Sequence, residues 1–237
     1  MRKNGRTARK LKKLAWRFSQ PDWADNHGVL LPVKHALVSP GIAREIYMGD
    51  YEAKEIEIIS KRLAADDVVF EVGAGLGFLS AFCAKLTGAE RVFAYEANPE
   101  LIPLIRETHA RNNVAPTLIN ALLAKGDGER EFHLEDDFWA SSAHRTGGRA
   151  ITVRQIDLNS ELARVKPSFL IVDIEGGEAE FFSGAELTTV KKICVETHPD
   201  VLGDHVLSQM FAGLVAKGFA LDFSLIRKNV FFFHRPE

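Results

Sequence analysis

The sequence predicts a doubly wound α/β fold: a mostly parallel sheet with helices on both faces and an antiparallel strand at its C-terminal edge. Three observations predict it. A glycine-rich turn joins an apolar run to a helical pattern near residue 73, apolar runs and helical patterns alternate from there to residue 217, and two short apolar runs close the chain. Chains that alternate strand and helix in this way form parallel sheets through right-handed crossovers.

Residues 68–98 form the unit around which the rest of the sequence is organised. An apolar run leads to Glu71, glycines follow at alternate positions from Gly73 to Gly77, and a helical pattern then leads to a second apolar run that ends in Glu96. Strand, glycine loop, helix, strand and carboxylate, in this order, are typical of the first unit of a nucleotide-binding α/β sheet.

The elements that follow continue the alternation. Asn98 and Pro99 suit the first positions of a helix, and residues 129–134 alternate polar and apolar side chains, which indicates an antiparallel hairpin. Residues 169–174 form a continuous apolar run, as expected of a strand buried on both faces. The remaining expectations are helices at 51–63, 98–113, 178–187 and 206–217, strands at 117–121, 151–156 and 192–197, and closing antiparallel strands at 219–223 and 230–234.

We expect three regions along the 237 residues: a basic arm at 1–20, a cap or lid segment with a helix at 21–65, and the sheet domain at 66–237. The formal net charge of −2 hides an asymmetry, because the first 17 residues carry eight basic side chains and no acidic one, whereas the remainder carries 22 basic and 32 acidic ones. The sheet domain therefore lacks the charge of a nucleic-acid-binding surface. Nothing in the sequence indicates an oligomeric state.

The basic arm has two interpretations. Leu11, Leu14 and Phe18 recur at helical spacing among basic residues, so residues 1–18 could form an amphipathic helix that contacts an anionic membrane surface or nucleic acid. A solvated leader is the alternative. No apolar run approaches the roughly 20 residues that span a bilayer. Because Cys83 and Cys194 fall in patterns typical of core residues, the reducing cytoplasm is the expected compartment.

The spacing of the glycines restricts the ligand of the loop. A dinucleotide fingerprint places its third glycine where this chain has Phe78, and no Gly-Lys-Ser/Thr follows to cradle a phosphate. The loop instead suits a nucleoside with a short zwitterionic tail, whose carboxylate meets the helix N-terminus and whose ribose hydroxyls meet Glu96. S-adenosylmethionine has these features, and its sulfonium centre favours acidic side chains nearby. The residues expected to bind it are Glu71, Gly73, Ala74, Gly75, Gly77, Phe78, Glu96, Ala97, Asn98, Asn120, Ala121 and Asp173.

A second motif, Val-Asp-Ile-Glu-Gly-Gly-Glu, covers residues 172–178 directly after the buried strand. Together with the glycine loop and residues 120–122 and 196–198, it resembles the FkbM family of S-adenosylmethionine-dependent methyltransferases over roughly residues 50–200. Ile174 and Gly177 replace the Val and Ala of the family motif, and Glu71 stands where many members have Asp. The resemblance implies a class I methyltransferase (Rossmann-like) fold. It also implies O-methylation of a hydroxyl on a sugar, a glycan or another small-molecule or secondary-metabolite acceptor.

The reaction centre is expected where the central strands end. Asp173 follows the fourth strand of the sheet, where the fold places the methyl group, and Glu175 in the same loop is expected to bind the acceptor. His198, after the next strand, is either a general base or a structural histidine. Three further candidates for acceptor contacts lie in the polar stretch 135–148: Trp139, Ser142 and His144.

A metal is not expected. Asp173, Glu175 and Glu196 could form an oxygen site for magnesium. Carboxylates at a sheet edge without ligand spacing, however, more often contact a cofactor or a substrate.

Two other functions stay open at this point. One is an RNA or protein methyltransferase that uses the basic arm as a substrate handle, although the chain has no Asn-Pro-Pro-Tyr motif of the kind common in enzymes that methylate bases or amides. The other is a non-catalytic binding scaffold, against which the intact glycine loop and Glu96 argue.

Overall fold

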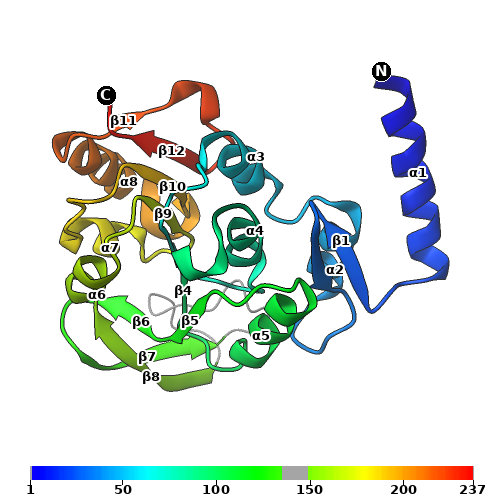
Figure 1. Cartoon of the computed structure of the whole chain (residues 1–237), viewed down its shortest axis with the longest axis horizontal. Coiled ribbons are helices and arrows are strands. Elements are labelled where there is room, and N and C mark those ends of the chain that lie inside the picture. The colour runs from blue at the N-terminus through cyan, green and yellow to red at the C-terminus, as the bar shows by residue number, and fades with distance from the viewer. Residues whose placement is uncertain (1, 135–148, 237) are drawn as a thin grey trace. The chain divides into compact units, whose positions relative to one another are not determined.

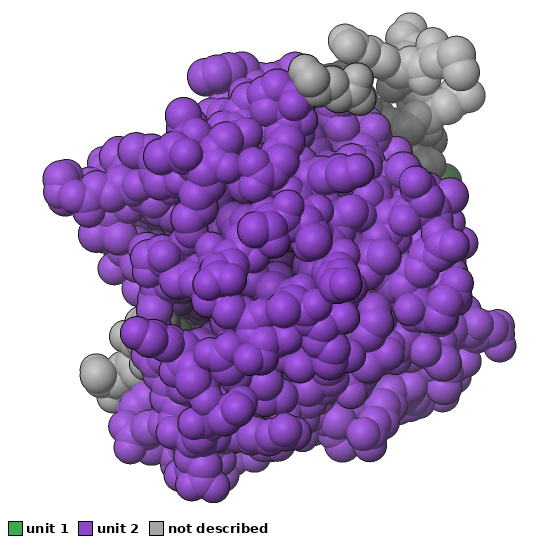
Figure 2. Space-filling model, turned by 60° about the vertical axis from the view of Figure 1, so that its left-hand side comes forward, with its two compact units in different colours: residues 1–53 green, residues 54–237 purple. Residues whose placement is uncertain are grey.

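The computed structural model of the chain describes residues 2–134 and 149–236. The chain divides into two compact units, Met1–Ala53 and Lys54–Glu237, and Figure 2 shows mainly the surface of the second. We call them the N-terminal unit and the sheet unit and describe each by itself. Among the described residues, no helix has the length and the apolar character needed to cross a membrane.

The N-terminal unit contains two helices and a hairpin. Its elements are α1 (Arg2–Phe18), β1 (Trp23–Asn26), β2 (Val29–Pro32) and α2 (Pro40–Met48). His27 and Gly28 join β1 to β2 with positive φ angles of 52° and 84°, as a tight hairpin turn with the twist of the strands requires. Ser39 caps α2 and Gly49 ends it in a left-handed conformation, which follows the usual rules for helix ends.

The sheet unit is built on a seven-stranded sheet with the order β11-β12-β10-β9-β3-β4-β5. The five adjacent strands from β10 to β5 are parallel, β12 is antiparallel to β10, and β11 is antiparallel to β12. The predicted doubly wound sheet with an antiparallel C-terminal edge is therefore confirmed. The strands are β3 (Val69–Val72), β4 (Val92–Glu96), β5 (Thr117–Asn120), β9 (Phe169–Val172), β10 (Lys192–Glu196), β11 (Ala220–Leu221) and β12 (Val230–His234).

Helices cover both faces of this sheet (Figure 1). Phe70 and Val72 of β3 share a buried cluster with residues of α6, α7 and α8, whereas Glu71 points to the opposite face, where α4 packs on β3 and β4. This alternation of side chains explains why the central strands read as continuous apolar runs. The helices are α3 (Ala53–Arg62), α4 (Phe78–Thr87), α5 (Ile102–Arg111), α6 (Leu158–Val165), α7 (Glu178–Gly184) and α8 (Pro199–Ala216), with short 3₁₀ turns at Ala89–Arg91 and Phe223–Leu225.

A second, three-stranded sheet was not foreseen. It consists of β6 (Leu122–Ala124), β7 (Gly128–Leu134) and β8 (Arg149–Asp157) in the order β6-β8-β7. Strand β7 pairs antiparallel with β8, and β8 pairs parallel with β6. The alternating pattern of residues 129–134 thus marks an antiparallel pair, but one that lies outside the main sheet. Phe132, Leu134 and Val153 form its small apolar core.

The starts of helices α5 and α8 differ most from the expected ones. Helix α5 begins at Ile102 rather than at Pro99, because the Asn98 side chain accepts a hydrogen bond from Glu100 N (2.9 Å) and holds these residues in a turn. Helix α8 begins earlier than expected, at Pro199, and Gly203 interrupts it with a left-handed φ of 76°. Neither difference moves a strand of the main sheet.

Candidate active site

The glycine loop joins the end of β3 to the start of α4. Gly73, Gly75 and Gly77 all have positive φ angles, of 87°, 54° and 74°. The N–H groups of Gly73 and Ala74 both donate to Tyr95 O, at 3.0 and 3.1 Å, which fastens the loop to β4. These conformations are accessible to glycine at little cost, so the loop can present backbone instead of side chains to a ligand.

Glu96 is buried at the end of β4, beside this loop. Its two carboxylate oxygens accept hydrogen bonds from Gly75 N (2.9 Å) and Asn98 N (2.8 Å). Asn120 at the end of β5 donates from Nδ2 to Glu96 O (2.8 Å), and Ala121 N donates to the same oxygen. Burial raises the pKa of Glu96 to about 7, although the backbone N–H groups lower it in part. The structure therefore brings these predicted cofactor residues together around the end of β4.

Glu71 lies beneath the loop, with its side chain fully buried against α4. Burial raises its pKa to about 8, while hydrogen bonds from Ser80 work in the opposite direction. The Ser80 hydroxyl also lies 3.0 Å from His109 Nε2, and burial lowers the pKa of His109 to about 4, so this ring is neutral at pH 7. These contacts place Glu71 where it holds the first turn of α4. Its predicted contact with the cofactor stays a prediction.

The start of α4 suits an anionic group. Gly77 occupies the cap position without a side chain, and the first turn contains no acidic residue, so the positive end of the helix dipole faces the loop. Together with the carboxylate of Glu96, the loop has the donor and acceptor groups that a nucleoside with a zwitterionic tail requires. S-adenosylmethionine therefore fits the residues that are present. The side chain of Phe78 is fully buried in the core, which leaves its backbone for any contact with the cofactor.

The loop after β9 has a strained backbone. Glu175 has a positive φ of 40° and Gly176 one of 93°. A Cβ atom at Gly176 would lie 2.5 Å from Val201 Cγ1, so α8 packs directly against this loop. A left-handed conformation at a residue with a side chain costs free energy and often marks a functional site. Here the left-handed conformation of Glu175 sets the path of the loop that carries Asp173 and Glu175.

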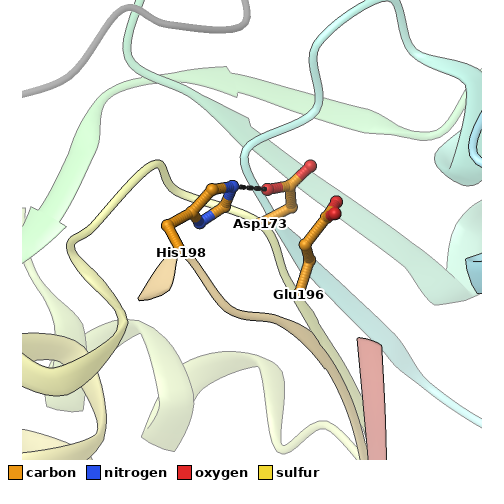
Figure 3. Close-up of side chains that lie close together, drawn as sticks. All are labelled: Asp173, Glu196 and His198. Atoms are coloured by element: carbon orange, nitrogen blue, oxygen red, sulfur yellow. Dashed lines mark ion pairs between the residues drawn. The ribbon is translucent and has the colours of Figure 1, made fainter. Parts of the chain in front are cut away.

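His198 lies among the carboxylates of this loop. Its Nδ1 contacts Glu178, which is completely buried and also accepts a hydrogen bond from Gly176 N (3.2 Å). Its Nε2 lies 3.4 Å from Glu175 Oε1 and 3.7 Å from Asp173 Oδ1. Figure 3 shows the ring directed toward Asp173, with Glu196 beside them. The residues after β9 and the residues at the end of β10 therefore meet, as expected from their positions at the carboxyl ends of the strands.

The environment of this cluster raises the pKa values of both His198 and Asp173, for different reasons. Burial would lower the pKa of His198, but hydrogen bonds to Glu175 and Glu178 outweigh it and raise the pKa to about 11. Burial, followed by the charge of Glu196, raises the pKa of Asp173 well above its ordinary value. In this arrangement His198 carries a positive charge among the carboxylates of Asp173, Glu175 and Glu178.

Two residues of the sheet unit support Glu196. Asn229 Nδ2 donates to Glu196 Oε1 (2.6 Å), and Lys54 Nζ lies 3.5 Å from the same oxygen and 3.0 Å from Asn229 Oδ1. Asn229 belongs to the turn before β12, so the antiparallel edge of the sheet contributes to the site. Burial and then the charge of Glu196 raise the pKa of Glu55, on α3, to about 7.

Sequence reasoning missed Glu55 and included Glu178 only as the last residue of the 172–178 motif. Glu55 has a signal in the sequence, because the buried Ile58 and Ile59 follow it three and four positions later on α3. Glu178 has none, since its contact with His198 joins residues 20 positions apart. The predicted acceptor residues Trp139, Ser142 and His144 lie outside the described residues.

Fold and site together define a class I methyltransferase, with S-adenosylmethionine as its cofactor. The chain belongs to the FkbM methyltransferase family, because residues 71–219 match the family described as "Methyltransferase FkbM domain". The predicted family, fold, enzyme class and cofactor are thus confirmed.

Two curated relatives resemble parts of the chain. Hexuronic acid methyltransferase AglP of Haloferax volcanii is 28% identical over 159 residues, which cover 63% of this chain and 64% of that protein. Ribosomal RNA small subunit methyltransferase A of Rubrobacter xylanophilus is 42% identical over 64 residues, or 27% of this chain and 24% of that protein. The chain thus spans less than two thirds of the length of either relative.

Among solved structures, precorrin-6y C5,15-methyltransferase from Geobacter metallireducens superimposes with a TM-score of 0.50 and 15% identity. The superposition covers 91% of this chain and 97% of that one. At this identity the likeness shows the fold alone.

Proposed function

We propose that this methyltransferase methylates a hydroxyl oxygen of a sugar, a glycan or another small-molecule acceptor. The similarity to a protein named hexuronic acid methyltransferase supports a sugar acceptor. The carboxylates and the imidazole beside the glycine loop support it too, because groups of this kind hydrogen-bond hydroxyls.

The observation that carries the proposal is the position of Asp173. Its backbone oxygen lies against Gly73 of the cofactor loop, and its side chain points into the cluster around His198. Its Oδ1 atom is buried and has no hydrogen-bond partner among the described residues. A buried acceptor without a donor is costly, so we infer that a group of the substrate supplies the donor.

The residues then have separate roles. The cofactor, when bound, supplies a methyl group activated by its sulfonium centre. Asp173 accepts the hydrogen bond of the acceptor hydroxyl and takes its proton as the oxygen gains the methyl group. Glu175 binds a second hydroxyl. His198 holds Asp173 and Glu175 in place through Nε2, while its Nδ1 contacts Glu178. Because both nitrogens face carboxylates, this arrangement does not favour His198 as the base.

Methyl transfer to a panel of uronic acids and the matching neutral sugars tests the proposal, with an isotopically labelled methyl group on the cofactor. Asp173→Asn should lower the rate by about 100- to 10,000-fold, the usual contribution of a general base, while cofactor binding persists. Asp204→Asn is the matched control, because it removes an exposed carboxylate on α8. Full activity of Asp173→Asn would contradict the role of Asp173.

We also propose that α1 contacts an anionic membrane surface. Leu11, Leu14 and Phe18 are 63%, 53% and 83% exposed and share one side of the helix. The opposite side faces α2 within the N-terminal unit, where Trp16 and Lys12 pack on Tyr47. An apolar stripe that is exposed and flanked by basic residues is typical of helices that lie in a membrane interface.

Cosedimentation of the full chain with anionic and with neutral vesicles tests this contact. We expect binding to the anionic vesicles, and loss of that binding in Leu14→Glu/Phe18→Glu. The matched control is Leu86→Glu/Phe223→Glu, which replaces exposed apolar residues of the sheet unit. Equal binding of both double variants would contradict a role of α1.

A further inference from the structure

We propose that Asp173, Glu196 and His198 bind one divalent cation of the Mn²⁺ or Mg²⁺ type at the carboxyl edge of the sheet. The sequence did not lead us to expect a metal, because these residues follow two different strands and show no ligand spacing along the chain. In the structure they lie side by side (Figure 3). The inference deepens the proposed function and rests on it only for the role of the ion in methyl transfer.

The geometry fits a cation. One ligand atom from each of the three residues lies within 4.8 Å of the other two. Ligand bonds of about 2.0–2.6 Å place the donor atoms of a Mg²⁺ or Ca²⁺ ion at most about 4–5 Å apart. The three residues therefore need only small side-chain movements to share one ion. Their backbones are fixed by the paired strands β9 and β10.

An unpartnered carboxylate atom points to a missing positive charge. Glu55 Oε1 is buried and has no hydrogen-bond partner in the described part of the chain. Glu55 is only 3% exposed, and its carboxyl lies close enough to interact with those of Glu196 and Asp173. Lys54 and His198 are the cations that contact these carboxylates in the described part of the chain. Buried carboxylates in excess of cations are stabilised by a metal ion.

Contacts behind the ligands orient them. Glu178 holds His198 through Nδ1, so that Nε2 faces Asp173. A carboxylate on the far nitrogen of a ligating histidine is the common way in which proteins fix its tautomer and raise its basicity. Asn229 fixes Glu196 through its hydrogen bond to Oε1.

The mixture of ligands restricts the ion. Two carboxylates favour Mg²⁺ and Mn²⁺, and an imidazole favours the transition metals, so Mn²⁺ suits the set of three. Water and acceptor oxygens would complete the coordination shell. A cation lowers the pKa of a bound hydroxyl, and Asp173 has a second oxygen that can take the proton. The positive charge of the cation would also allow a negatively charged uronic acid to approach this acidic site.

Binding of Mn²⁺ alone to the full chain tests the inference, measured by loss of the electron paramagnetic resonance signal of free Mn²⁺. We expect one ion per chain. Glu178→Gln removes the support of His198 and should weaken Mn²⁺ binding by about 10- to 100-fold. Glu196→Gln and His198→Gln each remove a ligand and should weaken Mn²⁺ binding by at least as much. The matched control Asp204→Asn/His205→Gln removes an exposed carboxylate and an exposed imidazole of α8 and should bind as the wild type does.

Thermal unfolding and cofactor binding of each variant show that the chain is folded. No binding of Mn²⁺ by the wild type up to millimolar concentration overturns the inference, and so does unchanged binding by Glu196→Gln. A chain that methylates an acceptor but binds no ion contradicts the metal site and leaves the proposed function intact. A chain that binds the ion but methylates no sugar or other hydroxyl acceptor contradicts the proposed function alone.

Discussion

The backbone oxygen of Asp173 lies where a side chain at Gly73 would begin. A Cβ atom at Gly73 would be 1.8 Å from this oxygen, far inside contact distance. Because β3 and β9 are parallel neighbours, the cofactor loop after β3 and the Asp173 loop after β9 leave the sheet side by side. Glycine at position 73 therefore joins the loop that is predicted to bind the cofactor to the place where the acceptor is proposed to react.

Gly73→Ala should damage both loops. The substitution adds a clash with backbone to the strain of a positive φ, and we expect it to destabilise the fold by about 2–4 kcal/mol. Cofactor affinity, measured by calorimetry, should fall with it. Gly126→Ala is the matched control, because Gly126 has a φ of 80° but no atom within 4 Å of the added Cβ. Equal effects of the two substitutions would show that strain, and not the contact with Asp173, decides the outcome.

Glu96→Gln should weaken cofactor binding by about 10- to 100-fold, the range for a lost hydrogen bond to a charged group. Both oxygens of Glu96 accept backbone N–H groups, so an amide must turn its NH₂ toward one of these donors. Calorimetry with S-adenosylmethionine measures the effect. Glu107→Gln, on the exposed surface of α5, should leave the affinity unchanged. An unaltered affinity in Glu96→Gln would mean that this carboxylate does not bind the cofactor.

Glu71→Gln should change how stability depends on pH. The folded chain holds the proton of Glu71 up to a pKa of about 8, whereas the unfolded chain releases it near 4.5. Between these values the folded state binds more protons, so stability falls as pH rises, by at most about 1.4 kcal/mol per pH unit. Urea unfolding at pH 5, 6, 7 and 8 should show a steeper loss in the wild type than in Glu71→Gln. Parallel curves would show that Glu71 ionises normally.

Methyl transfer to a small sugar should depend only weakly on salt, because few ion pairs with the acceptor are broken. An RNA substrate held by the basic arm would lose affinity steeply, since each phosphate contact releases a counterion. Initial rates between low and moderate potassium chloride separate the two cases. A steep loss of rate on an RNA substrate, without activity on sugars, would favour the alternative.

The parts of the fold set by local pattern could be predicted from the sequence. Glycine spacing, the apolar run at residues 169–174 and the terminal Glu96 each depend on neighbours along the chain, and the structure has the corresponding loop and strands. The three-stranded sheet could not be predicted, because β6 pairs with residues 155–157, more than 30 positions away. Hydrophobic alternation indicates a strand but not its partner.

The same limit decides which contacts of the candidate site could be predicted from the sequence. Asp173 directly follows β9 and Glu196 ends β10, and the carboxyl ends of such parallel neighbours lie at one edge of the sheet, so their meeting could be foreseen. The contact of Glu178 with His198 and the approach of Glu55 depend on how α7, α8 and α3 pack, which no local pattern contains.

The most direct test of the account is to identify the methylated atom. The full chain, S-adenosylmethionine with a labelled methyl group and a panel of uronic acids and neutral sugars are incubated, and the product is analysed by nuclear magnetic resonance. We predict a methyl ether on a hydroxyl carbon, formed by the wild type and lost in Asp173→Asn. A methyl group on nitrogen or on the carboxylate as an ester, or no transfer by a chain that binds the cofactor, would contradict it.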